Sequence, residues 1–179
     1  MINRNLSVLL FAALMAMAQT AGAAEVVEAD VCVYGGTSGG VVAAVQSARM
    51  GKKVILLEPG RHLGGMTSGG LSAVDIGDPR SVGGLAREYF TRLVKRYGKE
   101  LAWDKPFVSK AGGPATGGAY SIEPHAAEAV FDEMVQQAKV AVYREAKLAK
   151  AVKDAARITE LQTEDGRTFR AQMFIDATY

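Results

Sequence analysis

The fold is decided by one stretch of sequence, Val31-Cys32-Val33-Tyr34-Gly35-Gly36-Thr37-Ser38-Gly39-Gly40. Its apolar start is typical of a buried strand, and its glycines indicate a tight turn that opens a helix. The helix is expected to run to about Met50 and to stop at Gly51. Its apolar stripe has helical spacing and consists of Val41, Ala44, Val45 and Ala48. A second strand, Val54-Ile55-Leu56-Leu57-Glu58, follows, and this order is that of a dinucleotide-binding βαβ unit.

The glycine turn presents backbone groups that suit a pyrophosphate. Gly35 ends the first strand where the chain must bend, and Gly40 lies on the first helical turn, where a side chain would separate helix from strand. The N–H groups at the start of a helix lack partners within the helix, and the helix dipole adds partial positive charge there. We therefore expect the backbone of Thr37 to Gly40 to face an anion.

Thr37 departs from the strict form of this motif, and Glu58 agrees with it. The middle glycine of the strict G-x-G-x-x-G pattern falls at Thr37, whose side chain narrows the approach of a phosphate but whose hydroxyl can donate to a phosphate oxygen. Glu58 lies 23 residues after Gly35, close to the spacing of about 20 residues expected for an acid that binds a ribose. The alternative for Glu58 is a solvated residue at a strand end.

Three motifs together resemble the FAD-dependent oxidoreductase family, whose FAD-binding fold is like that of glutathione reductase. They are Tyr34 to Gly40, Leu63-Gly64-Gly65-Met66-Thr67 and Phe174-Ile175-Asp176-Ala177-Thr178. The resemblance runs from about Asp30 to Tyr179. It is closest to the exported branch called xanthan-lyase-like, in which Thr at the second glycine position is usual and to which Ile122-Glu123-Pro124-His125 also points.

The resemblance implies FAD as the cofactor and assigns residues to its parts. The residues expected to line the pyrophosphate are Gly35, Gly36, Thr37, Ser38, Gly39 and Gly40. Glu58 would hold the adenosine ribose, and the stretch that passes along the pyrophosphate toward the isoalloxazine would comprise Arg61, Gly64, Gly65 and Met66. Ala146 or Lys147 would approach the adenine through backbone atoms, and Thr178 would lie near the flavin.

The expected fold class is α/β, with a Rossmann-like parallel core sheet and an inserted antiparallel β-meander. Helices are predicted over 82–97, capped by Ser81, and over 121–139, with Pro124 in its first turn. The charged residues of the first of these helices read as a solvated face. A core strand is predicted over 140–144, and three short meander strands over 147–152, 158–163 and 168–171 precede a last core strand over 173–177. Residues 66–81 and 101–121 are expected to be irregular.

Residues 1–23 are predicted to be a secretory signal peptide, which implies a periplasmic or secreted protein. Arg4 supplies the positive start, 6–18 is an apolar run too short to span a bilayer, and small residues precede a cut before Ala24 or Glu25. The alternative is an uncleaved membrane anchor. Residues 24–179 are then expected to be the N-terminal part of an FAD/NAD(P)-binding domain, incomplete at its C-terminus and without a substrate domain.

Composition excludes several classes of function. The 179 residues suffice for one core, and a net charge of +2 gives no electrostatic case for nucleic acid. The lone Cys32 excludes an intrachain disulfide and a Cys-ligated iron–sulfur cluster within this chain. His62 and His125 are the only histidines, so no metal site is expected.

The sequence leaves three functions open. The first is an oxidoreductase whose flavin accepts a hydride at N5 from a substrate that the sequence does not identify. The second is a nicotinamide-binding Rossmann domain, which has no particular use for the Arg61 to Gly65 stretch or the meander. The third is a non-catalytic, truncated flavoprotein fragment. No catalytic residue is assigned: ordinary polar roles are favoured for His125, Ser68 and Asp75. Substrate, electron acceptor and oligomeric state stay open.

Overall fold

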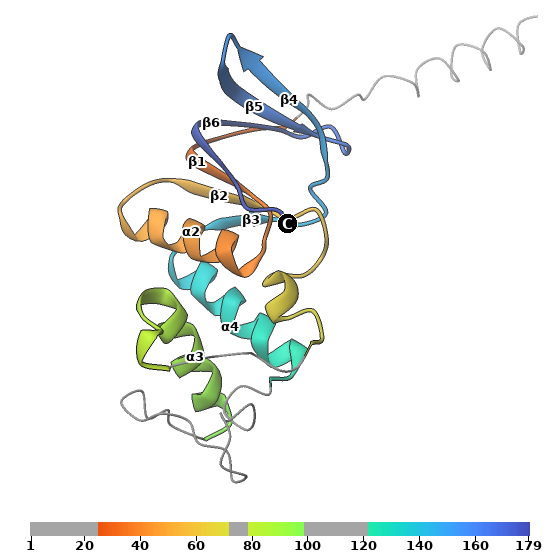
Figure 1. Ribbon diagram of the computed structural model, residues 1–179. Helices are drawn as coiled ribbons and strands as arrows, with labels where there is room; N and C mark the ends of the chain where they lie inside the picture. Colours follow the sequence, from red (N-terminus) through yellow and green to blue (C-terminus); the bar gives the residue numbers. More distant parts are fainter. Residues whose placement is uncertain (1–24, 72–78, 99–121) are drawn as a thin grey trace, which may run out of the picture.

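The computed structural model describes residues 25–71, 79–98 and 122–179, and these build one mixed sheet with helices stacked below it (Figure 1). The strands are β1 (Val26–Tyr34), β2 (Val54–Leu57), β3 (Ala141–Tyr143), β4 (Leu148–Asp154), β5 (Arg157–Thr163) and β6 (Thr168–Asp176). The α-helices are α2 (Ser38–Arg49), α3 (Gly84–Arg96) and α4 (Pro124–Gln137), and two short 3₁₀ helices are η1 (Gly65–Thr67) and η2 (Pro79–Ser81).

The sheet has the order β3-β2-β1-β6-β5-β4 in the described part of the chain. The first four strands in this order are parallel, and β5 is antiparallel to its two neighbours, β6 and β4. The chain moves outward from β1 to β3 and then returns to the other side of β1. The strand order thus reverses between β1 and β6, and open α/β sheets bind ligands beside the carboxyl ends of the strands at such a point. The predicted fold class is confirmed.

The meander differs from its prediction in one respect. The strands predicted at 168–171 and 173–177 form a single strand, β6, and the prediction of two strands is wrong. The physical reason is that a strand has two hydrogen-bonding edges. One edge of β6 pairs with β1 along nearly its whole length, while the other pairs with β5 over Thr168 to Arg170.

Two apolar clusters cover the two faces of the parallel strands. Val33 and Leu56 face α2 and α4, whereas Cys32 and Ile55 face the opposite side, where Phe169 packs. This alternation is the ordinary period of a strand buried on both faces. Cys32 is fully buried, and this burial raises the pKa of its thiol to about 12. The interpretation of Cys32 as a packing residue is confirmed.

Helix α2 agrees with its prediction, since Val41, Ala44 and Val45 are buried and the chain leaves the helix at Gly51 with a φ of +83°. Helix α4 begins at Pro124, and its predicted apolar face is buried from Ala127 to Met134.

The predicted start of α3 is wrong. Ser81 lies in η2, and the N-cap of α3 is Gly83. Gly84 has a φ of +52°, a left-handed conformation, so a regular helix cannot extend back through it to Ser81.

Helix α3 packs on α4, on the side away from the sheet (Figure 1). The rings of Tyr89 and Phe131 stack with centroids 4.3 Å apart. Glu88 accepts two hydrogen bonds from Arg49 of α2, at 2.7 and 2.8 Å, and these bonds hold the pKa of its carboxyl below the usual value. The charged side of α3 is therefore not only a solvated face, because it also ties α3 to α2.

Several predictions fall outside the described residues: the signal peptide, Asp75, the irregular stretch at 101–121 and Ser121. They stay predictions. None of the helices in the described part of the chain has the length and apolar character needed to cross a membrane.

The contact between Gly40 and Gly35 predicts a large effect of one methyl group. A Cβ at Gly40 would overlap the carbonyl oxygen of Gly35, which is backbone and cannot rotate away. We expect Gly40→Ala to lower the free energy of unfolding by about 3 kcal/mol, the upper end of the usual range for overpacking. Chemical denaturation measures this value. The matched control is Gly39→Ala on the same helical turn, where a Cβ would meet only the hydroxyl of Thr37 at an ordinary 3.7 Å. Equal stability of the two variants would contradict the account.

Candidate functional site

The residues that follow three strands leave the sheet together at one edge. Tyr34, the last residue of β1, lies opposite Leu57 of β2 and Asp176 of β6. The next residues along the chain are Gly35, Glu58 and Ala177. The strand register therefore brings the glycine turn, the predicted ribose acid and the last predicted motif to one place.

The protein itself excludes side chains from most of the glycine turn. Gly35 has a φ of +103°, and a Cβ there would lie 2.8 Å from the carbonyl carbon of Ala177. A Cβ at Gly36 would lie 2.7 Å from a carboxylate oxygen of Glu58. With Gly40, these glycines let β1, α2 and β6 approach one another closely.

Gly39 differs from its neighbours because no protein packing requires a glycine there. It is exposed, and the closest atom to a Cβ at this position would be the hydroxyl of Thr37, at 3.7 Å. Among the described residues, its N–H has no hydrogen-bond partner. A free N–H on a bare first helical turn is a cradle for an anion, since the helix dipole also favours negative charge there.

Thr37 is the N-cap of α2, and its hydroxyl is already engaged. The oxygen accepts from the Gly40 N–H at 3.1 Å, and the hydroxyl donates to the carbonyl oxygen of Ala177 at 2.8 Å. This hydroxyl links α2 to the end of β6, and its donation to a phosphate oxygen stays a prediction. Thr37 thus has a structural role that the glycine of the strict motif does not fill.

Glu58 is half-buried and lies over the turn. One carboxylate oxygen accepts from the Gly36 N–H at 2.7 Å and the other accepts from the Gly60 N–H at 2.5 Å. Each carboxylate oxygen has about two acceptor positions, so each keeps capacity for a further donor such as a ribose hydroxyl. Glu58 is not merely a solvated residue at a strand end.

The stretch after β2 runs back against the turn. Gly64, with a φ of +103°, donates its N–H to the carbonyl oxygen of Gly36 at 2.7 Å. Arg61 is exposed and its Nε donates to Glu145 at 2.9 Å. Gly65 opens η1, and the Met66 N–H donates to the hydroxyl of Tyr179 at 2.8 Å, while the Met66 side chain is exposed. The structure therefore brings Gly64 to the turn but directs Arg61 toward the loop after β3.

Two further contacts with the cofactor are predicted, one from Ala146 or Lys147 and one from Thr178. Ala146 is fully buried and donates its N–H to the carbonyl oxygen of Glu58 at 2.9 Å, whereas Lys147 is exposed. The Lys147 carbonyl oxygen accepts from the Glu164 N–H at 2.9 Å, and the contact of either backbone with an adenine stays a prediction. Thr178 is exposed, and both its N–H and its hydroxyl donate to Asp176, at 3.0 and 2.7 Å. These two hydrogen bonds hold the pKa of the Asp176 carboxyl below its usual value.

Two cavities border these elements. One of about 290 Å³ is lined by Ser38, Gly39, Thr67 and apolar residues of α2, α3 and α4. The other, of about 400 Å³, is lined on one side by His62, Gly65 and Ser68 and on the other by Pro124, His125 and Glu128. His125 is exposed, and its Nε2 lies 3.8 Å from a carboxylate oxygen of Glu123. No group of three or more His, Cys, Asp and Glu side chains within the described ranges is arranged to hold a metal ion.

Three residues shape the site in ways that the sequence does not predict. Asp176 lies in the motif at 174–178 without a predicted role, although an acid two residues before a threonine is a common turn pattern. For Ser68 an ordinary polar role is favoured over one beside the flavin; in the structure it is buried and its hydroxyl donates to the carbonyl oxygen of Leu63. Glu128, which contacts the same loop, lies 65 residues from Leu63 in sequence, so no local signal marks it.

The geometry suits one class of ligand. It combines an N–H on a bare helix start with a carboxylate whose oxygens can accept from hydroxyls, and both lie at the carboxyl edge of a parallel sheet. A phosphate next to the helix and a ribose next to the acid satisfy these groups together. The arrangement is therefore that of a nucleotide site.

Comparison with protein families agrees with this geometry. The family model described as "FAD dependent oxidoreductase" matches residues 30–179. No curated protein matches the sequence.

Solved structures of flavoenzymes share the fold. The myxobacterial chondrochloren halogenase, described as a variant of FAD-dependent halogenases, is 21% identical with a TM-score of 0.58, covering 85% of this chain and 37% of its own. L-Amino acid deaminase from Proteus vulgaris is 17% identical with a TM-score of 0.56, covering 87% of this chain and 48% of its own. The flavin-containing monooxygenase from Stenotrophomonas maltophilia is 20% identical with a TM-score of 0.53, covering 85% and 38%. The chain thus spans less than half the length of these proteins.

The double role of Glu58 predicts the effect of Glu58→Gln. The amide keeps one acceptor oxygen, so it cannot accept from both Gly36 and Gly60 and also from a ribose. We expect the dissociation constant for FAD, measured by quenching of flavin fluorescence, to rise at least about tenfold. The control is Glu133→Gln, which removes a carboxylate that pairs with Arg96 on the outer side of α4. Wild-type affinity of Glu58→Gln would show that the carboxylate does not bind the cofactor.

Proposed function

Since the chain belongs to the FAD-dependent oxidoreductase family, whose cofactor is FAD, we propose that residues 30–179 bind the ADP half of FAD in an oxidoreductase. When bound, the flavin supplies the redox chemistry by accepting a hydride or electrons from a reduced substrate. The residues of this chain bind the cofactor and fix its orientation. The substrate and the electron acceptor are not identified by these residues.

The main support for this proposal is that Gly39 is exposed and has no packing reason to be a glycine. Glycine loses more conformational freedom on folding than any other residue, so a glycine that packing does not require needs another reason. Close approach of a pyrophosphate to the backbone is such a reason. The free N–H of Gly39, at the positive end of α2, is placed to donate to it.

The proposed binding residues follow from the same geometry. The pyrophosphate would lie along the turn formed by Gly35, Gly36, Thr37, Ser38, Gly39 and Gly40. Glu58 would accept from the ribose hydroxyls, and Lys147 would lie toward the adenine. Gly64 would support the turn through its hydrogen bond to Gly36, with Gly65 and Met66 leading toward the flavin.

The catalytic chemistry is not assigned to a side chain of this chain. His125 lies in the other cavity and close to Glu123, so we do not propose it as an acid or base. A nicotinamide cofactor is the competing proposal, since a βαβ unit with an acid after its second strand also serves nicotinamide dinucleotides.

Flavin content tests the proposal. The purified protein is expected to show the visible absorbance of a bound flavin, and chromatography of the released cofactor should identify FAD. We expect Gly39→Val to lose the flavin while keeping the melting temperature of the apoprotein, because a Cβ at this exposed position contacts only the Thr37 hydroxyl, at 3.7 Å, and the added side chain enters the space proposed for the ligand. The control is Gly83→Val at an exposed position with no atom near a Cβ, which should keep the flavin. A colourless protein that NAD stabilises against heat would refute the proposal.

A further inference from the structure

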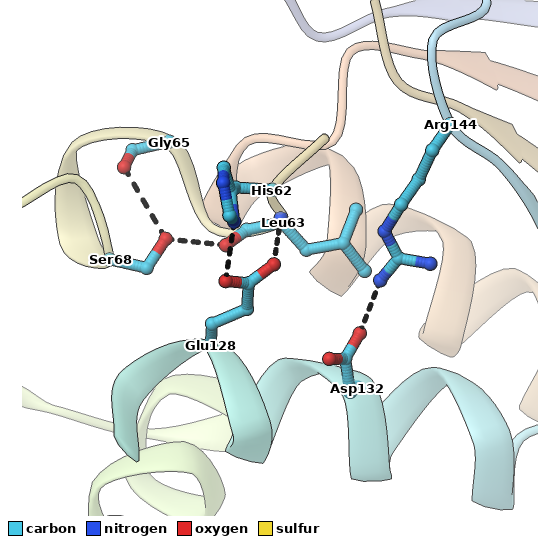
Figure 2. Close-up of polar contacts among 7 residues, drawn as sticks. All are labelled: His62, Leu63, Gly65, Ser68, Glu128, Asp132 and Arg144. Carbon is cyan, nitrogen blue, oxygen red and sulfur yellow. Dashed lines mark hydrogen bonds and ion pairs between the residues drawn. The ribbon is translucent and has the colours of Figure 1, made fainter. Parts of the chain in front are cut away.

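A carboxylate on α4 holds the loop that supports the glycine turn. One oxygen of Glu128 accepts from the Leu63 N–H at 3.1 Å, and the other lies 2.8 Å from Nδ1 of His62 (Figure 2). The Glu128 side chain is only 21% exposed, whereas that of His62 is 78% exposed. Since exposed ion pairs contribute little, the bond to the Leu63 backbone is the stronger part of this contact.

The peptide groups of Leu63 are fixed on both sides. Its N–H donates to Glu128, its carbonyl oxygen accepts from the buried hydroxyl of Ser68, and its side chain is fully buried (Figure 2). Leu63 is therefore held by α4, by η1 and by the core at once.

Gly64, the next residue, connects this anchored loop to the cofactor site. A Cβ at Gly64 would lie 2.5 Å from the ring of Phe131, so the loop rests on α4 without a side chain between them. Gly64 donates to the carbonyl oxygen of Gly36, and Gly36 donates to Glu58. A short chain of hydrogen bonds thus joins Glu128 to the residues proposed to bind pyrophosphate and ribose.

We propose that Glu128 is a positioning residue of the cofactor site. It does not touch the ligand; it fixes Leu63 and Gly64 so that Gly36 and Glu58 keep the geometry that binds FAD. This inference rests on the proposed function. A site held in place before the ligand arrives binds more tightly because less conformational freedom is lost on binding.

The chain offers a matched control one helical turn along. Asp132 also extends from α4 and forms an ion pair with Arg144 at 2.6 Å, which ties α4 to the end of β3 and not to the loop (Figure 2). Asp132→Ala removes a partly buried acid of the same helix without touching Leu63. Glu128→Gln is the conservative variant, because its amide oxygen can still accept from the Leu63 N–H.

Two measurements on the purified protein test the inference. The first is the dissociation constant for FAD, and the second is amide hydrogen exchange at Leu63 and Gly64 followed by NMR. For Glu128→Ala we expect the dissociation constant to rise about tenfold and exchange at both amides to accelerate. Glu128→Gln should stay within about threefold of the wild-type affinity, and Asp132→Ala should leave both measurements unchanged.

The outcomes separate this inference from the proposed function. If the wild type binds FAD and Glu128→Ala binds it with the same dissociation constant, the role of Glu128 is overturned and the proposed function stands. An equal loss of affinity in Asp132→Ala would overturn it as well, since the effect would then be general to α4. If the wild type binds no FAD, the proposed function fails, and unchanged exchange at Leu63 and Gly64 in Glu128→Ala would then overturn the anchor on its own.

Discussion

The backbone of Gly40 lies directly against the carbonyl oxygen of Gly35, and the rest of the structure depends on this approach. It lets α2 start immediately at the carboxyl end of β1 and then run back along the sheet. The positive end of the helix therefore lies at the edge where β1, β2 and β6 end together. Any side chain at Gly40 would push the helix away from that edge, and a ligand at this position would lose the dipole and the free N–H of Gly39.

The site is held from three directions before any ligand is bound. Thr37 links the start of α2 to the end of β6, and Glu58 spans the turn from the end of β2. Gly64 donates its N–H to the carbonyl oxygen of Gly36. These contacts join residues up to 140 positions apart in sequence. The same hydrogen bonds that stabilise the fold thus set the positions of the groups proposed to bind FAD, which reduces the conformational cost of binding.

The sequence predicted what local pattern controls. The apolar run of β1, the small-residue stripe of α2 and the spacing to Glu58 led to the βαβ unit, and Pro124 indicated the first turn of α4. The prediction failed where geometry depends on long-range partners. Ser81 had the chemistry of an N-cap, but α3 begins only at Gly84, because the left-handed conformation of Gly84 prevents a regular helix from extending back to Ser81. The two strands predicted at 168–177 are one, because β6 shares its edges between two neighbours. Glu128 and Ser68 carry no sequence signal for their roles, since their partner, the Leu63 peptide, is specified only by the folded chain.

If α2 and Glu58 bind the ADP half of FAD, a crystal structure of the protein with FAD will show the contact. We expect a pyrophosphate oxygen about 3 Å from the nitrogen of Gly39, with ribose hydroxyls on the carboxylate of Glu58. A nucleotide bound elsewhere, for instance in the cavity lined by His62 and His125, would contradict it. So would a pyrophosphate that leaves the N–H of Gly39 without a partner.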